Sequence, residues 1–310
     1  MPKPQGVRVV TPLTPSGRQA KVVWTRGKGC HELAEALGGD HADRVTGDVA
    51  EGCISERADV LVSKKLPSSF DLVNVAVPVD FDPNRVNKVV ATVAGGPHSV
   101  LAAETASTLA SRLGVDAEML SAARSEEEIE AANEILDQVG ATLPEIDRRV
   151  VVVDGVSELV DQLDDGALLV MGAPGGSWIN RSRTGPGARL RRTAQAGAVI
   201  VRSAPDRVFR FMREPVYVSP LRLADDTLRF HSEKTLAVAD AGRLVGLVRR
   251  EGLVRAGDSP VASVMEEAQS VKVDETIAEA RELEPTFRPD PIPVTDHDEH
   301  LVGALSLPWP

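Results

Sequence analysis

Cysteine, aromatic residues and long apolar runs are all scarce in this chain of 310 residues. Its two cysteines, Cys30 and Cys53, are too few for a disulfide framework and have no metal-ligand spacing, so we expect reduced thiols. No stretch of 18 apolar residues occurs, which argues against a helix that spans a membrane. The first residues lack the apolar segment of a signal peptide, and we therefore expect a cytoplasmic protein without membrane insertion.

Aromatic residues make up 3% of the chain and hydrophobic residues 42%, so the cores must be built mainly from Val, Leu, Ala and Ile. Cores of this kind suit parallel sheets that are covered by helices. The formal net charge of −11 argues against a protein that binds nucleic acid through its overall charge. The length predicts two or three domains.

The N-terminal part of the chain, residues 1–80, predicts a small α/β segment whose role the sequence does not indicate. Short apolar runs lie at residues 21–24, 59–62 and 72–77, and a helical pattern of apolar residues begins at Cys30 and ends at Gly38-Gly39. The glycine-rich turn at residues 25–29 is either a phosphate cradle or a plain strand-to-helix turn, and the lack of a P-loop pattern favours the plain turn. Pro, Asp and Asn at residues 80–87 predict a linker to the next domain.

Residues 87–204 alternate between predicted strands and helices. Strands are predicted at residues 88–93, 117–120, 149–153, 167–171 and 198–201. Helices are predicted at residues 97–113, 125–139, 156–163 and 188–196, the second of them with a capping box formed by Ser125 and Glu128. This order predicts an α/β fold with a five-stranded parallel sheet and helices on both faces. The last strand would leave an apolar edge at which a second copy could pair.

A glycine-rich loop follows the strand predicted at residues 167–171. Its glycines and arginines are Gly172, Gly175, Gly176, Arg181, Arg183, Gly185 and Gly187. Ligands bind at the carboxyl ends of parallel strands, and glycines let backbone N–H groups and a helix N-terminus approach phosphate. The loop therefore predicts a phosphate site. The alternative is a surface loop with solvated arginines, which the position in the fold and the glycine spacing disfavour.

The first, second and fourth of these glycines have the spacing Gly-x₂-Gly-x₉-Gly, and residues 87–204 thereby resemble a universal stress protein domain. The resemblance implies a domain that binds ATP or AMP, with further contacts at Ala94 and Gly95 after the first strand. In that family the last motif glycine is followed by Ser or Thr, and the first strand ends with Asp. This chain has Pro186 and Ala94 at those places, so the resemblance implies weak binding.

Residues 208–310 contain an internal repeat, in which three landmarks recur in the same order 53 to 57 residues later. The landmarks pair Met212 with Met265, residues 236–240 with residues 292–296, and residues 244–246 with residues 301–303. Each half predicts the order strand, helix, strand, turn, strand. Because each half is too small to bury a sheet face alone, we expect the two halves to pack together.

The repeat resembles a pair of CBS domains, the adenine-nucleotide sensor modules of the cystathionine β-synthase type. The resemblance implies nucleotide clefts between the two modules and dimerisation through helix faces. The family's closing Thr or Ser is Arg249 in the first module and Ser306 in the second, and its Asp is replaced by Gly252 and Trp309. Arg249 would either hold a phosphate by its charge or pair with neighbouring acidic residues.

The two resemblances together imply a regulatory protein that senses an adenine nucleotide, forms a homodimer and modulates a partner protein, either an enzyme or a transporter. The alternative is a pseudo-sensor, a structural or interaction subunit whose sites no longer bind nucleotide. An enzyme such as an ATP hydrolase is the least supported class. No nucleophile or carboxylate is patterned beside His98, which we expect to be a surface residue, and no carboxylates that could hold Mg²⁺ are evident near the glycine loop.

Overall fold

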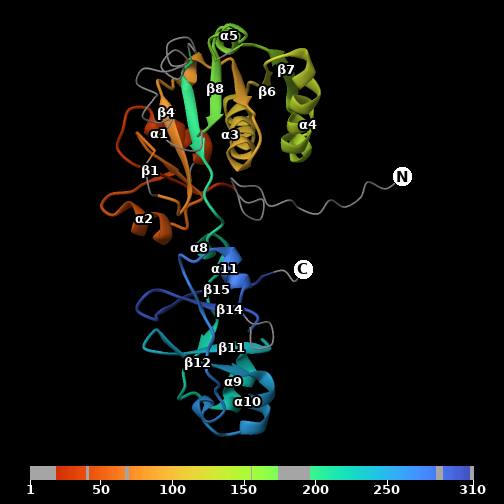
Figure 1. Cartoon of the computed structure of the whole chain (residues 1–310). Coiled ribbons are helices and arrows are strands. Elements are labelled where there is room, and N and C mark those ends of the chain that lie inside the picture. Colours follow the sequence, from red (N-terminus) through yellow and green to blue (C-terminus); the bar gives the residue numbers. More distant parts are fainter. Residues whose placement is uncertain are drawn as a thin grey trace. The chain divides into compact units, whose positions relative to one another are not determined.

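The computed structural model describes residues 19–39, 42–66, 70–154, 156–173, 196–283 and 289–307. The chain divides into two compact units, Met1–Ala204 and Pro205–Pro310, here called unit 1 and unit 2 (Figure 1). The division falls in the short Pro-containing segment between the α/β part of the sequence and the repeat.

Unit 1 contains one large mixed sheet and the helices that cover it. Its strands are β1 (Val22–Trp24), β2 (Ala42–Arg44), β3 (Val60–Val62), β4 (Asn74–Val79), β5 (Lys88–Thr92), β6 (Asp116–Ala123), β7 (Asp147–Val152), β8 (Ala167–Gly172) and β9 (Ala198–Arg202). Its described helices are α1 (Cys30–Gly38), α2 (Val49–Ser55), α3 (Pro97–Leu113), α4 (Ile129–Val139) and α5 (Val156–Asp161). The sheet has nine strands in the order β2-β1-β3-β4-β9-β8-β5-β6-β7. Within it β4 and β9 pair in antiparallel fashion, and the other described neighbours pair in parallel fashion.

The structure does not separate residues 1–80 from residues 87–204, which corrects two expectations. The sheet has nine strands rather than five, because β4 pairs with β9 from Val75–Arg202 to Val79–Ala198. The strand edge that was expected to be free for a second copy is therefore occupied by β4. The physical reason is that β1 and β3 are only three residues long, so they gain stability by extending a sheet that is already large.

The segment predicted as a linker is part of unit 1. A 3₁₀ turn spans Pro83–Arg85, and Asp82 caps it by accepting the Asn84 N–H. The Asn87 N–H donates to the Gly166 carbonyl at 3.0 Å. The Asn87 hydrogen bond ties the segment to the loop before β8, so a turn rich in Pro and Asp marks no boundary here.

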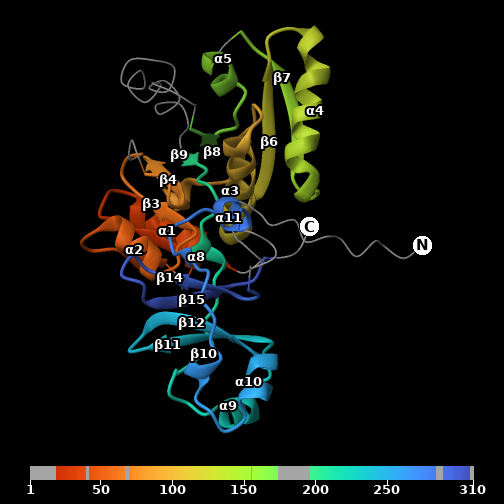
Figure 2. The same cartoon turned by 60° about the horizontal axis from the view of Figure 1, so that its bottom comes forward.

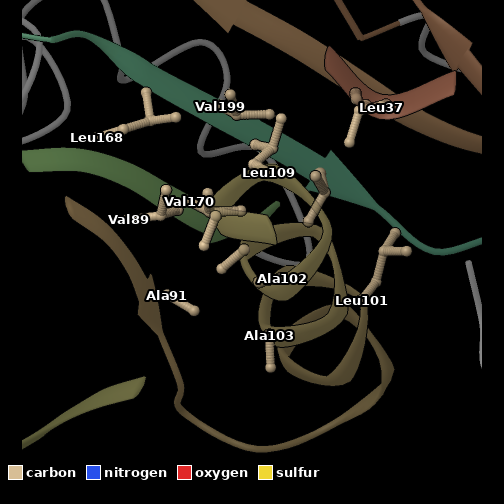
Figure 3. Packing of buried hydrophobic residues seen from close by; sticks show 14 of the residues in the cluster. Leu37, Val89, Ala91, Leu101, Ala102, Ala103, Leu109, Leu168, Val170 and Val199 are labelled. Carbon is tan, nitrogen blue, oxygen red and sulfur yellow. The ribbon is translucent and has the colours of Figure 1, made fainter. Parts of the chain in front are cut away.

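Apolar residues cover both faces of the sheet, as the alternation along β5 requires. Val89 and Ala91 point to the face on which α1, α3 and α4 pack, whereas Val90 belongs to the cluster on the opposite face. Figure 3 shows Leu101 and Leu109 of α3 against the first face. Of the described helices, α1, α3 and α4 pack on this first face, and α5 packs on the opposite face, where its Leu159 joins a smaller cluster.

The start of α4 differs from the predicted one. The helix begins at Ile129 after a 3₁₀ turn, and the Ser125 side chain makes no capping hydrogen bond. The Glu128 carboxylate instead accepts the Arg124 N–H at 2.9 Å, so the predicted capping box is wrong. A capping box does form in unit 2, between Thr276 and Glu279.

Unit 2 is built from two similar halves. Its strands are β10 (Tyr217–Val218), β11 (Thr235–Asp240), β12 (Arg243–Arg249), β13 (Val271–Lys272), β14 (Ile292–Thr295) and β15 (Leu301–Leu305). Its described helices are α8 (Val208–Phe211), α9 (Ala224–Phe230), α10 (Arg250–Ala256) and α11 (Ile277–Arg281). The sheets β10-β11-β12 and β13-β14-β15 each have one parallel and one antiparallel pair in the same order, which confirms the predicted repeat. Figure 2 shows α9 and α10 together beside β11 and β12.

Candidate functional site

The turn after β5 holds two of the residues predicted to contact nucleotide, Ala94 and Gly95. Gly95 and Gly96 have φ angles of 88° and 79°, in the left-handed region that glycine adopts without strain. The Ser99 hydroxyl closes the turn, because it accepts the Ala94 N–H at 3.1 Å and donates to the Gly95 carbonyl at 2.8 Å. Ala94 is exposed and its N–H is already bonded, so it offers a ligand only a methyl group and a carbonyl.

Gly172 ends β8 directly beside His98, the second residue of α3. A Cβ at Gly172 would lie 2.8 Å from the His98 Cβ and 3.0 Å from the His98 carbonyl oxygen. Only glycine allows this approach, so packing against α3 explains Gly172 without any ligand. The structure thus brings together the end of β8 and the turn after β5, which the sequence placed in one site.

His98 is not the plain surface residue that the sequence predicted. It is partly buried, and its Nδ1 accepts a hydrogen bond from the Ser203 N–H at 3.0 Å. Burial, together with the charge of Arg202, holds the pKa of His98 below its usual value. The imidazole is therefore neutral at pH 7, as an acceptor at Nδ1 must be.

Gly175, Gly176, Arg181, Arg183, Gly185 and Gly187 lie outside the described residues. The helix predicted at residues 188–196 also lies outside them, apart from Ala196.

The two modules of unit 2 pair crosswise through their backbones. Arg213 of the first module exchanges two hydrogen bonds of 2.9 Å with Ala304 of the second. Leu247 of the first module does the same with Glu266, at 2.9 and 2.8 Å. These two bridges join equivalent positions of the repeat. In each module, the last strand, β12 or β15, thus pairs with a segment of the other module.

The repeated Met and Gly landmarks meet at these crossings. A Cβ at Gly303 would lie 2.5 Å from the Met212 sulfur, and one at Gly246 would lie 2.8 Å from the Glu266 carbonyl oxygen and 3.3 Å from the Met265 sulfur. Each methionine therefore packs over the glycine of the other module. The sequence pattern identified these residues but not their exchange between modules.

A cleft of about 270 Å³ lies between the modules beside one of these crossings. It is lined by Thr235, Leu247, Arg249, Glu266, Glu267, Ala268, Gln269 and Pro289. The Arg249 Nε lies 3.2 Å from the Glu266 carboxylate, and both side chains are about half exposed. Of the two alternatives for Arg249, the structure shows pairing with a neighbouring acid.

The charges of this cleft do not favour phosphate. Glu266 compensates Arg249, and Glu267 adds a further negative charge. The Gln269 Oε1, which is also an acceptor, is buried and has no hydrogen-bond partner among the described residues. Ser306, the residue that matches the family in the second module, follows β15 and is exposed.

In the part of the chain that the structure describes, no group of three His, Cys, Asp or Glu side chains is placed to hold a metal ion. The helices described there are all too short or too polar to cross a membrane.

No protein-family model matches the sequence, and no curated protein matches it. Similar solved structures include CBSX2, a CBS-pair protein from Arabidopsis thaliana, which is 23% identical over 33% of this chain and 89% of that chain with a TM-score of 0.31. A CBS domain pair/ACT domain protein from Thermotoga maritima is 24% identical over 33% of this chain and 89% of that chain, with a TM-score of 0.31.

The cytosolic domain of the Mg²⁺ channel MgtE, solved in complex with ATP, is 21% identical over 43% of this chain with a TM-score of 0.31. That match spans 57% of the channel domain. Two of these three neighbours are described as CBS-pair proteins, and the resemblance of residues 87–204 to universal stress proteins stays a prediction.

Proposed function

We propose that this chain is a cytoplasmic regulatory protein without catalytic activity, which senses an adenine nucleotide such as ATP or AMP and modulates an enzyme or transporter. The observation that carries the proposal is the strand order β9-β8-β5-β6-β7 in unit 1. The chain runs outward from β5 to β6 and β7, and then returns to β8 on the other side. The carboxyl ends of β5 and β8 are thus a topological switch point, where ligands of open α/β sheets bind.

The residues at this switch point support an anionic ligand. Gly172 ends β8 there, and the turn at residues 94–96 leads directly into α3. Pro97 has no N–H and the Ser99 N–H donates to the Gly96 carbonyl at 3.1 Å, so it is the positive end of the α3 dipole that would favour phosphate here. We therefore propose that the nucleotide binds in unit 1 rather than in the cleft of unit 2, where Glu266 neutralises Arg249.

Calorimetric titration of the full chain with ATP, ADP and AMP tests this placement. A lost charged hydrogen bond costs roughly 1.5–3 kcal/mol, so with Ala94 in the place of Asp we expect a Kd of about tens to hundreds of micromolar. Gly175→Val should abolish binding, and Arg249→Ala should leave it unchanged. Binding that survives Gly175→Val and disappears in Arg249→Ala would place the nucleotide in unit 2 instead.

The pseudo-sensor is the second candidate, and specific contacts favour it. Ser99 already occupies the Ala94 N–H, and Glu266 already pairs with Arg249. A protein of this kind would use both units as interaction surfaces. The absence of calorimetric heat with every nucleotide at millimolar concentration would favour this candidate over the sensor.

We further propose a homodimer formed through unit 2. Large apolar side chains are exposed on and beside α9 and α10, with Leu221, Phe230 and Val254 exposed to 80%, 73% and 63%. Burying such a surface against a second copy is favourable, and an isologous pair is the commonest arrangement. Light scattering should give twice 33.0 kDa, and Phe230→Glu should give the monomer. A wild-type monomer at micromolar concentration would exclude this dimer.

A further inference from the structure

The segment that leaves β9, residues 203–206, is bonded to unit 1 through two side chains. The Ser203 N–H donates to Nδ1 of His98, and the Ala204 N–H donates to Oδ1 of Asn74, both at 3.0 Å. Most backbone N–H groups donate to backbone carbonyls, whereas these two donate to side chains. The exit of the chain from unit 1 is therefore held by two particular residues.

Two residues after Ala204 the chain is bonded within unit 2. The Asp206 carbonyl accepts the Ile277 N–H at 2.8 Å, and the Asp206 carboxylate lies 2.8 Å from Nη1 of Arg210. Pro205 has no N–H and is the residue between these two sets of hydrogen bonds. The hydrogen bond from the Ser203 N–H to His98 therefore helps to hold the connecting segment on unit 1.

His98 also belongs to the proposed nucleotide site. It is the second residue of α3, its Cβ lies against Gly172, and Ser99 beside it closes the turn at Ala94. A ligand at the carboxyl ends of β5 and β8 would meet the same first turn of α3. One residue thus contacts both the site and the connection.

The bond to Ser203 requires a neutral ring at Nδ1. A protonated imidazole carries N–H groups on both nitrogens and accepts at neither. Arg202 of β9 is the charged group acting on the ring, while its described neighbours Pro97, Ser99 and Gly172 carry no charge. Burial and Arg202 keep the pKa of His98 low, and an anion beside the ring would raise it.

We propose that His98 is a latch, which holds Ser203 while its imidazole is neutral and releases it when a phosphate-bearing ligand at the switch point draws a proton onto the ring. Release removes the hydrogen bond from Ser203 to His98 and leaves the one from Ala204 to Asn74. The identity of the ligand rests on the proposed function. The response to protons alone does not, because every group that it needs is present in the free chain.

The proton response is tested by NMR on the full chain without nucleotide, from about pH 8 to about pH 5. The Ser203 amide resonance should move with the midpoint of the His98 ring, below the usual value of about 6.5. The Ala204 amide is the internal control, because its acceptor on Asn74 does not titrate. His98→Asn keeps a side-chain acceptor that does not titrate and should abolish the movement, whereas His31→Asn should leave it unchanged.

The ligand response is tested with ATP at about pH 7, by the same resonance and by calorimetry in two buffers of different ionisation enthalpy. ATP should move the Ser203 amide toward its acid position, with proton uptake that His98→Asn removes. A Ser203 amide resonance that does not shift between about pH 8 and about pH 5 would overturn the latch. ATP that binds without moving Ser203 or taking up protons would overturn the coupling and leave the proposed function standing. A Ser203 amide that titrates in a chain that binds neither ATP, ADP nor AMP would uphold the proton latch and reject the nucleotide sensor.

Discussion

A fragment that begins at residue 87 and ends at residue 204 should fail to fold cooperatively, whereas residues 1–204 should melt as one unit. The shorter fragment lacks β4, so β9 loses its pairing from Val75–Arg202 to Val79–Ala198 and presents a bare edge. It also lacks α1, whose Leu33 and Leu37 belong to the same buried cluster as α3.

Circular dichroism during heating, with light scattering at each temperature, measures this difference. We expect a sharp transition for residues 1–204 and a broad, aggregating one for residues 87–204. A sharp transition of the shorter fragment at the same temperature would mean that the N-terminal strands only extend a domain that is already complete.

Replacing Glu118 with Gln should lower the melting temperature of unit 1 by about 4–8 °C, which corresponds to about 2 kcal/mol. Glu118 is 4% exposed in β6, and its carboxylate lies 2.8 Å from Nζ of Lys88 in β5 and bonds to Arg149 in β7. One buried carboxylate therefore joins three neighbouring strands. Lys88 and Arg149 are partly exposed, so solvent screening reduces the cost of leaving them without it.

The effect of Glu118→Gln should depend on pH. Burial alone would raise the pKa of Glu118, but the hydrogen bonds and charges of Arg149 and Lys88 outweigh it and hold the pKa below its usual value. The stabilisation is thus present above the ordinary pKa of about 4.3 and is lost as the pH falls through the folded pKa. Calorimetry of wild type, Glu118→Gln and the exposed control Glu127→Gln measures this. An equal loss at neutral and at strongly acidic pH would contradict the ion network as its cause.

Local sequence signals predicted the long elements of unit 1 well. The helix predicted at residues 97–113 is α3, because Pro97 favours a helix start and Gly114 adopts the left-handed conformation that ends one. The strand β2 was missed, since it has three residues, two of them exposed, and so has no apolar pattern. The pairing of β4 with β9 was also missed, because it joins positions far apart in the sequence and leaves no local signal.

For the candidate site, too, the sequence predicted the local placement of residues but not their long-range contacts. The sequence indicated that Gly172 and the turn at Ala94 would lie at the carboxyl ends of strands, and the structure places Gly172 against His98 in the first turn of α3, which follows that turn. The role of His98 could not be foreseen, because its partner Ser203 is 105 residues away. The pairing of Arg249 likewise depends on the crosswise bridge between Leu247 and Glu266.

Native mass spectrometry of the full chain with ATP, ADP or AMP tests the central claim, that this protein binds an adenine nucleotide in unit 1, most directly. The proposal predicts one bound nucleotide per chain in the wild type and in Arg249→Ala, and none in Gly175→Val. A wild-type chain that carries no bound nucleotide at millimolar concentrations of ATP, ADP and AMP would contradict it.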